Sequence, residues 1–531
     1  MPHFELIHLI CAGVVAVAAL LIILHILFTM RDDSERASLW IILVLCIPVL
    51  GIILYLLAGI TRRNTLGKRI SHAVEEFLKS RDEAEHRSLK DYRDVMERFI
   101  CRGDAAGDTM DHRRMLDALL HSSLEDPASA PMIPGTIPLT GNRLELLCDG
   151  SAAYPAMIEC IRSARHNINM QTFIFADDRI GRIMMGELKK KAQEGVQVRV
   201  ICDRFGSFKS LFSLFFLPYL KKTPNLKMIP FSNASLLTPW RIQLRNHRKL
   251  LIVDGRTAFI AFSHTSDCCS AEPSQRSSSR FPVLNISEEN FKWMTSPEKE
   301  IHDFHCRLTG PSVGELQYAF LCDWFYASHK KNKEDLFTRD YFPMPEKCGD
   351  SIVRAVASGH GYLFEGSEKA FFTAASTAKK SIWIISPYFA PSKDFSKALR
   401  MASARGVDVR LIVPRNNNHW YVKMAARSFY ESLIGNGVRV FERLGTFTHA
   451  KAMLVDGEWA YFGSSNCDIR SFRLNYELDL LVSQGDFTGA LHRQFLEELK
   501  NSEEMGEAYL ASRTRPQKLL ESVCALMTPV L

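Results

Sequence analysis

The sequence contains an internal repeat, and this repeat constrains the fold more strongly than any other feature. In each copy a helical segment ends at a glycine and is followed by a valine-rich strand, over residues 191–200 and again over 402–411. The glycines, Gly195 and Gly406, stand where helices commonly end in a left-handed residue. Strands that alternate with helices predict a largely parallel sheet with helices on both faces in each copy. Two such copies can meet around a pseudo-twofold axis and bring their equivalent loops face to face.

Each copy also carries one basic motif, a histidine and a lysine two residues apart, with an aspartate five residues after the lysine. On an extended segment the histidine and the lysine project to the same face, and the apolar residues that follow bury the strand. Two imidazoles and two ammonium groups suit one tetrahedral anion, a phosphodiester that is transferred through a covalent histidine. Such chemistry requires no metal and no cofactor, and the aspartates are expected to anchor their loops. The motif residues are His247, Lys249 and Asp254 in the first copy and His449, Lys451 and Asp456 in the second.

Composition sets wider limits on the protein. A chain of 531 residues is too long for one small core, so two or three domains are expected. The net charge of +7 permits an anionic partner, a lipid headgroup or a nucleic acid, without choosing between them. The thirteen cysteines show no metal-finger spacing, and Cys268 and Cys269 are adjacent, which favours a reducing compartment over a disulfide framework or a zinc site.

The first sixty residues predict a membrane anchor. Two apolar runs, 6–28 and 39–60, are each long enough to cross a hydrocarbon core that requires about 20 residues, and together they predict an N-terminal transmembrane helical hairpin. A signal peptide fits less well, because no basic segment precedes the first run and no small-residue cleavage site follows it. Pro48 and Gly51 interrupt the second run, which a membrane helix tolerates.

Charge predicts the orientation of this hairpin. An excess of Lys and Arg marks the cytoplasmic side of a membrane, so we expect the N-terminus and everything after residue 61 in the cytoplasm. The basic residues just past the second run are Arg62, Arg63, Lys68 and Arg69. These patterns predict four regions: the membrane hairpin (1–65), a charged and largely helical connector (66–137), a first half (138–330) and a second half (331–531).

With both motifs in place, the chain resembles the phospholipase D superfamily over nearly all of its length, and specifically the bacterial cardiolipin synthases with two N-terminal membrane helices. The paired HxKxxxxD motifs carry the resemblance to the superfamily, and Gly463–Leu478 carries the resemblance to the synthases. The resemblance implies an α/β fold of two phospholipase D-like halves, each a mixed sheet flanked by helices, related by a pseudo-twofold and preceded by the membrane hairpin.

The resemblance also implies a division of labour in which one histidine attacks the phosphorus of a phosphatidyl group. The other protonates the departing alcohol and then deprotonates the acceptor, and imidazoles with ordinary pKa values near 6.5 can hold these opposite protonation states. On the resemblance, Glu477 is the orienting carboxylate for His449, and Asp303 is the counterpart for His247. The residues expected to hold the nonbridging oxygens are Lys249, Lys451, Ser464 and Asn466.

The first copy departs from the superfamily pattern after Asp254. Ala261, Phe262 and His264 replace the small residues and the asparagine that the resemblance predicts. Phe262 supplies no hydrogen-bond donor, whereas His264 could still donate one hydrogen bond. We expect retained activity with an altered pocket, and a weakened enzyme or a changed donor specificity is the alternative.

His302 and His305 offer another interpretation, as metal ligands. Apart from the adjacent Asp303 and Cys306, no further set of thiolates or carboxylates accompanies them in the sequence, which disfavours that interpretation.

Three functions of different class are consistent with these features. The first is a phosphatidyltransferase of a bacterial inner membrane that makes cardiolipin from phosphatidylglycerol and a second phospholipid. The second is a hydrolase of the same chemistry, a phospholipase D or a nuclease, in which water resolves the intermediate. The third is a lipid-binding protein without activity. Anchoring in a bilayer favours phospholipid partners over nucleic acid, the intact His247 and Lys249 argue against the third function, and no oligomeric state follows from the sequence.

Overall fold

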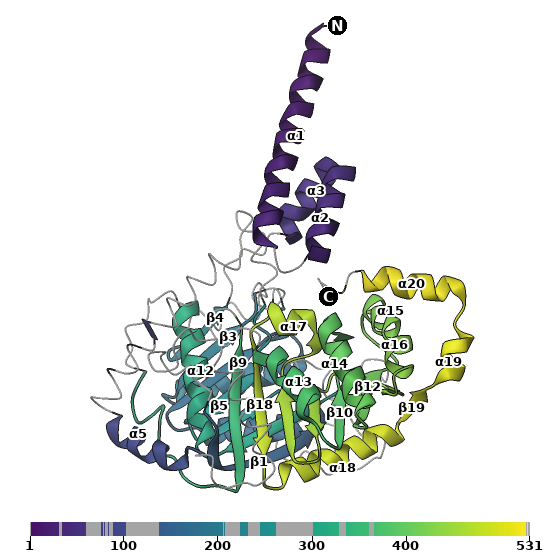
Figure 1. Cartoon of the computed structure of the whole chain (residues 1–531). Coiled ribbons are helices and arrows are strands. Elements are labelled where there is room, and N and C mark those ends of the chain that lie inside the picture. Colours follow the sequence, from purple (N-terminus) through teal and green to yellow (C-terminus); the bar gives the residue numbers. More distant parts are fainter. Residues whose placement is uncertain are drawn as a thin grey trace. The chain divides into compact units, whose positions relative to one another are not determined.

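A computed structural model describes residues 2–30, 34–59, 76, 77, 79, 83, 89–101, 137–204, 206, 207, 223–231, 245–261, 301–328, 336–359, 366–526 and 528. These residues fall into two compact units, one that holds the N-terminal helices and one that holds the repeat (Figure 1). In the N-terminal unit, α1 (Pro2–Thr29) contains a segment, Ile10–Thr29, with a mean hydropathy of 2.9. This confirms the first apolar run as a helix long and apolar enough to cross a membrane.

The second apolar run differs from the single helix over 39–60 that the sequence predicts. It is divided into α2 (Ser34–Cys46), α3 (Pro48–Leu54) and a π-helical turn, η1 (Tyr55–Gly59). The break falls at Ile47, whose φ of −135° and ψ of 71° lie outside the helical region. A residue that precedes proline is disfavoured in the helical conformation, which explains the position of the break.

Beyond the break, the chain turns back along α2. A Cβ atom on Gly51 would lie 2.6 Å from the carbonyl oxygen of Leu43, so only glycine lets the two backbones approach this closely. The ring of Tyr55 packs edge-on against Trp40, with 5.4 Å between centroids, and its hydroxyl lies 2.8 Å from Nδ1 of His25 in α1. Residues 34–59 therefore form a tight helical hairpin of their own that packs against the end of α1.

The second unit is built on one sheet of fifteen strands in the order β19-β13-β12-β10-β15-β16-β18-β9-β1-β8-β6-β5-β2-β3-β4. The strands of the first half are β1 (Leu139–Cys148), β2 (Asn167–Thr172), β3 (Gln197–Cys202), β4 (Leu226–Pro230), β5 (Leu250–Val253), β6 (Thr257–Ile260), β7 (Ile301–His302) and β8 (Phe304–Thr309). Those of the second half are β9 (Ser351–Ser358), β10 (Ser381–Ile385), β11 (Phe389–Ala390), β12 (Asp408–Pro414), β13 (Arg439–Arg443), β14 (Phe447–Thr448), β15 (Ala452–Val455), β16 (Trp459–Gly463), β17 (Cys467–Asp468), β18 (Glu477–Ser483) and β19 (Ser502–Met505).

The repeat predicted from the sequence is confirmed as two halves that meet where β1 pairs with β9, with Leu139 opposite Val353. Counting outward from this seam, β8, β6, β5, β2, β3 and β4 have their equivalents in β18, β16, β15, β10, β12 and β13. Within the fifteen-stranded sheet, only the strands β2-β3-β4 and β10-β12-β13 pair in parallel. The expectation of a largely parallel sheet was therefore wrong. The motif strands β5 and β15 each end in a tight turn, which makes the next strand antiparallel.

Helices cover both faces of the sheet, as predicted. In the first half, α7 (Asp149–Ser163) and α8 (Arg179–Gln193) form a core with Leu251 and Val253 of β5, and α12 (Ser312–Ala327) contacts the same strand, which is buried throughout. The helices of the second half are α13 (Gly366–Thr377), α14 (Lys393–Ala404), α15 (Trp420–Ser428), α16 (Tyr430–Ile434), α17 (Ile469–Arg473), α18 (Phe487–Lys500), α19 (Glu507–Ser512) and α20 (Arg515–Ala525).

Most of the predicted connector, residues 66–137, lies outside the described residues. Its described part includes α5 (Lys90–Met96) and a 3₁₀ turn, η2 (Glu97–Phe99). Tyr92 of α5 is buried and packs edge-on against Phe342, with 5.6 Å between ring centroids. The described part of this region is therefore attached to the rest of the second unit by aromatic contacts.

Candidate active site

The two basic motifs converge on one buried site. His247 and Lys249 stand just before β5, and His449 and Lys451 stand just before β15, the equivalent strand of the second half. All four side chains are buried. Nδ1 of His247 lies 3.1 Å from the carbonyl oxygen of Ser464 in the second half, and burial together with the charges of Lys249 and Lys451 lowers the pKa of His247. The structure therefore brings together the two motifs that the sequence predicts to share one site.

The orienting carboxylates are assigned crosswise relative to the prediction. Nδ1 of His247 lies 3.0 and 3.1 Å from the two carboxylate oxygens of Glu477. Nδ1 of His449 lies 2.9 Å from Oδ2 of Asp303. The prediction that Glu477 serves His449 and Asp303 serves His247 was wrong, because each histidine is oriented by a carboxylate from the other half.

Backbone pairing between the halves explains this exchange. The short strand β14 runs parallel to β7, and the amide of His449 donates to the carbonyl of His302 at 2.7 Å. In the same way, the amide of His247 donates to the carbonyl of Tyr476 at 2.9 Å. In both places the residue after the accepting carbonyl is the carboxylate, so the strand that holds the histidine also determines its partner.

Burial and neighbouring charge set the protonation state of the site. Burial, together with both lysines and the other imidazole, lowers the pKa of His247 well below its ordinary 6.5. Burial and Lys451 lower the pKa of His449 to about 4. Burial alone would raise the pKa of Asp303, but His449 and Lys451 hold it below its ordinary value. At neutral pH the site therefore presents two neutral imidazoles, each with an acceptor on Nδ1.

The hydroxyl of Ser464, which the sequence predicted to hold a substrate oxygen, makes hydrogen bonds within the protein. Its hydroxyl donates to Oε2 of Glu477 at 2.5 Å and accepts from the amide of Leu478 at 2.9 Å, while its carbonyl oxygen lies 3.1 Å from Nδ1 of His247. Ser464 thus positions Glu477, the carboxylate that orients His247. Burial raises the pKa of Glu477. Asn466 is buried, and among the described residues no hydrogen-bond partner faces its side-chain oxygen.

The aspartates of the motifs have the structural role expected for them. Asp254 and Asp456 adopt left-handed backbone conformations, with φ of 50° and 55°, in the turns after β5 and β15. Their carboxylates accept hydrogen bonds from consecutive backbone amides at the start of the neighbouring strand. These donors are Arg165, His166 and Asn167 for Asp254, and Lys379, Lys380 and Ser381 for Asp456.

Comparison with known proteins places this geometry in a family. Residues 157–263 and 372–499 match the family described as "Cardiolipin synthase, PLD-like domain", and residues 17–59 match the family described as "Phospholipase_D-nuclease N-terminal". The chain belongs to the phospholipase D superfamily. Its two matched segments each contain one basic motif, and its enzymatic relatives extend over 95% of its length, which makes it an enzyme of this superfamily.

Two relatives of this superfamily member are cardiolipin synthases, from Alkalihalophilus pseudofirmus and Listeria welshimeri. Each is 29% identical over 507 residues, which cover 95% of this chain and 91% and 95% of the respective relative. Among solved structures, phosphatidylserine synthase from Haemophilus influenzae aligns with a TM-score of 0.53 at 14% identity, over 79% of this chain and all of that one. This last similarity shows the phospholipase D fold.

The departure predicted in the first motif can be described only in part. Phe262 and His264 lie outside the described residues. Ala261 stands where the second half has Gly463 and adopts a left-handed φ of 59°, which alanine rarely does. At Gly463 a Cβ atom would lie 2.2 Å from Oδ1 of Asp479, so the second half requires glycine at this position.

A further difference between the halves was not predicted. Asp479 accepts hydrogen bonds from the hydroxyls of Tyr461 and Ser465, both at 2.5 Å, and so supports the loop that carries Ser464. The first half has His305 at the corresponding place, two residues after its carboxylate. His305 is fully buried, and neither ring nitrogen has a partner among the described residues. Only comparison of the two copies, residue by residue, could have signalled this exchange.

His302, considered as a metal ligand from the sequence, has a different role. Its Nδ1 lies 2.7 Å from Oδ1 of Asp149 and its Nε2 lies 2.9 Å from Oε1 of Glu498. Burial opposes charge on the ring, but these two hydrogen bonds raise the pKa of His302 to about 9. His302 is therefore a cation at neutral pH that joins α7 of the first half to α18 of the second.

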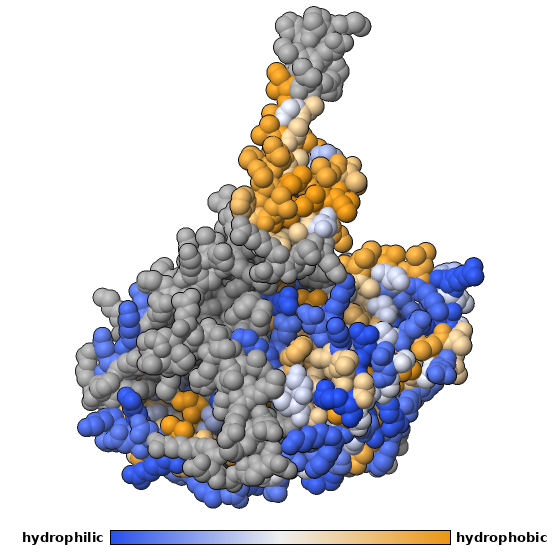
Figure 2. Space-filling model, viewed as in Figure 1, coloured by the Kyte–Doolittle hydropathy of each residue, from blue (hydrophilic) through white to orange (hydrophobic). Residues whose placement is uncertain are grey.

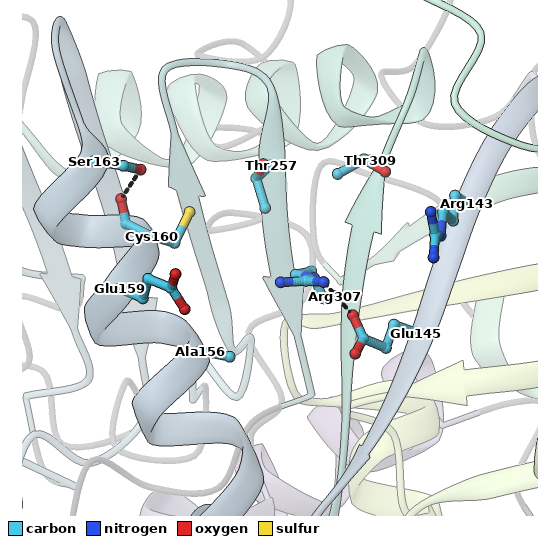
Figure 3. Close-up of a pocket in the computed structure, with 9 residues that line it drawn as sticks. All are labelled: Arg143, Glu145, Ala156, Glu159, Cys160, Ser163, Thr257, Arg307 and Thr309. Atoms are coloured by element: carbon cyan, nitrogen blue, oxygen red, sulfur yellow. Dashed lines mark hydrogen bonds and ion pairs between the residues drawn. The ribbon is translucent and has the colours of Figure 1, made fainter. Parts of the chain in front are cut away.

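A surface pocket of the first half lies at the ends of β6 and β8 that are remote from the first motif, so it is separate from the active site (Figure 3). Thr257 begins β6 and Thr309 ends β8, whereas the first motif precedes β5, at the other end of the β5–β6 hairpin. Arg307 and Glu145 form an ion pair across this pocket at 2.5 Å. No residue of either motif lines it. The lining residues are Arg143, Glu145, Ala156, Glu159, Cys160, Ser163, Thr257, Arg307 and Thr309.

Proposed function

We propose that the protein is a cardiolipin synthase of the inner membrane, which transfers a phosphatidyl group from phosphatidylglycerol to the free alcohol of a second phospholipid. The observation that carries the proposal is the crosswise site, in which two buried imidazoles, each oriented by a carboxylate from the other half, lie beside two lysines. The extent of the similarity to cardiolipin synthases and the apolar helix α1 support a lipid substrate.

The proposed reaction has two steps through a phosphohistidine. In the first, Nε2 of one imidazole forms a bond to phosphorus while the phosphorus–oxygen bond to glycerol breaks, and the other histidine gives glycerol its proton. In the second, that histidine takes a proton from the acceptor hydroxyl, whose oxygen displaces the imidazole. Nδ1 of each ring already contacts a carboxylate, which leaves Nε2 for phosphorus and for the proton.

The substrate itself helps to assign the protonation states. Without substrate both imidazoles are neutral, since burial and the neighbouring lysines lower their pKa values. A bound phosphodiester adds a negative charge beside them, which raises these pKa values and favours a proton on one ring. The lysines then stabilise the nonbridging oxygens as negative charge develops in the transition state.

The fold of the N-terminal unit bears on the orientation in the membrane. An α-helix of 13 residues, such as α2, is about 20 Å long, shorter than a hydrocarbon core of about 30 Å. Because α3 returns along α2, the run over 34–59 enters and leaves the bilayer on one side, and α1 alone crosses it. We therefore infer that the N-terminus lies on the far side of the membrane, and not in the cytoplasm as the sequence predicted.

The distribution of charge agrees with this orientation. Residues 1–30 contain neither Lys nor Arg, so every basic residue that flanks the membrane segments follows α1. Such a distribution favours the cytoplasmic side of the membrane for the catalytic unit. The flanking basic residues are Arg31, Arg36, Arg62, Arg63, Lys68 and Arg69.

The decisive experiment supplies labelled phosphatidylglycerol to the purified full-length protein in bilayers and separates the lipid products. Cardiolipin with release of glycerol is the expected result. Phosphatidic acid as the main product would show a hydrolase, and no product, with retained lipid binding, would show a protein without activity. His247→Asn is the matched control, because it removes the proposed chemistry and keeps a small polar side chain.

A further inference from the structure

The last helix of the chain, α20 (Arg515–Ala525), has its polarity inverted. Its buried residues are Cys524 and the charged Glu521, which accepts from the guanidinium of Arg513 at 2.9 Å. Its outward face is apolar, with exposed fractions of 67% for Leu519, 52% for Val523 and 71% for Leu526, which follows the helix. These positions, four and three residues apart, share one side of a helix. A helix in water normally has the opposite arrangement.

This apolar face continues onto α15 (Trp420–Ser428). The two helices pack against one another, and Trp420, the first residue of α15, has 61% of its surface exposed. Figure 2 shows apolar residues gathered over α20. We define the outer face as Trp420, Leu519, Leu520, Val523 and Leu526. Tryptophan beside aliphatic residues is typical of surfaces that lie at the boundary between headgroups and acyl chains.

Aromatic rings connect the outer face to the active site. From Trp420, each ring lies next to another until the sequence of contacts ends at His449, with centroid separations between 5.4 and 6.1 Å. The successive pairs are Trp420–Tyr421, Tyr421–His419, His419–Tyr388, Tyr388–Phe447 and Phe447–His449. A series of neighbouring rings therefore links the outer face to the buried imidazole.

The charges around the outer face are basic. The exposed charged side chains of α20 are Arg515 and Lys518, and its one acidic residue, Glu521, is buried in the pair with Arg513. In α15, Lys423 is partly exposed, whereas Arg427 pairs with the buried Glu442 at 2.8 Å. The exposed acidic neighbour is Glu431 of α16, which lies 4.0 Å from Lys518. Basic side chains are attracted to an anionic membrane surface. A bilayer that contains anionic phospholipid is complementary to this face in both charge and polarity.

From the inverted helix, the exposed tryptophan and the basic flanks, we infer that the outer face is a second membrane contact of the catalytic unit, and that it lies on the acyl boundary of an anionic bilayer. The contact orients the catalytic unit so that a phospholipid can pass from the bilayer along the aromatic rings to His449. The passage of a phospholipid to His449 rests on the proposed function, whereas the membrane contact does not.

Photo-crosslinking tests the contact without any use of activity. The full chain, with Leu519→benzoylphenylalanine, is reconstituted in vesicles of phosphatidylglycerol and phosphatidylcholine, irradiated, and analysed by mass spectrometry for lipid adducts. Leu496→benzoylphenylalanine is the matched control, since Leu496 of α18 is an exposed leucine outside the outer face. Lipid adducts at position 519 and few at position 496 are expected. Equal labelling at both positions, or adducts between two copies of the chain at position 519, would overturn the inference.

A second measurement separates the membrane contact from the chemistry. L519S/V523S/L526S is compared with L496S on two substrates, long-chain phosphatidylglycerol in bilayers and a short-chain analogue dissolved as monomers. Because burial of one leucine corresponds to about a tenfold change in an equilibrium, the triple variant should turn over the bilayer substrate at least about tenfold more slowly. Turnover of the dissolved analogue should stay unchanged. An equal loss on both substrates would show damage to the site and would contradict the inference, as would no loss on either.

Discussion

The cation at His302 gives a quantitative prediction about pH and stability. The ring lies between the carboxylates of Asp149 and Glu498, at 2.7 and 2.9 Å, with about a tenth of its side chain exposed. A rise of its pKa from 6.5 to about 9 corresponds to about 3 kcal/mol of stability, at about 1.4 kcal/mol per unit. Since the pKa is raised on folding, this contribution is complete below about pH 6.5 and is lost as the pH rises through about 9.

His302→Asn removes the cation and keeps a small polar side chain. We expect a fall in Tm of about 3 °C at pH 6, and a much smaller difference from the unmodified protein at pH 9.5. The measurement is thermal unfolding of the purified full-length protein in detergent across this pH range. His166→Asn is the control, because the side chain of His166 is 55% exposed and its ion pair with Asp340 is long, at 3.5 Å. A loss of Tm at His302 that is the same at pH 6 and pH 9.5 would refute the reasoning.

Four further outcomes can be checked on the same protein. His449→Ala and His247→Asn should each lower cardiolipin formation about a hundredfold or more, and near-normal synthesis by either variant would exclude its histidine from the chemistry. Asp456→Asn should lower Tm through loss of the backbone hydrogen bonds at its loop, so a variant with normal Tm and no activity would contradict the anchoring role. Synthesis should persist in EDTA; loss that divalent metal restores would disprove the metal-free mechanism. A tag ahead of α1 should be reached by an impermeant reagent on intact cells, and a C-terminal tag should not. Protection of both tags would show that the chain crosses the membrane a second time.

The sequence predicted the parts of the site better than their connections. Duplication of the motif was sufficient to predict that His247 and His449 share one site, because equivalent loops of two related halves face each other. It could not predict which carboxylate serves which histidine, since that choice depends on backbone pairs between residues far apart in sequence, such as the amide of His449 and the carbonyl of His302.

The membrane segments show the same division. Hydropathy predicted α1 correctly, because length and apolar composition are sufficient for a single long helix. Hydropathy cannot distinguish a crossing helix from one that folds back, and here the difference lies in the contact of Gly51 with the backbone of Leu43. The inverted face of α20 was likewise hidden, because a short amphipathic pattern does not reveal which of its faces points inward.

The crosswise carboxylates have a consequence for how such an enzyme could have arisen. A single half possesses a histidine and a carboxylate, yet it cannot bring the two together, because its own carboxylate orients the ring of the other half. An ancestor with one copy would have been catalytically competent only as a symmetric pair of chains. The presence of both copies in one chain makes that association permanent, and it leaves each copy free to differ, as Asp479 and His305 do.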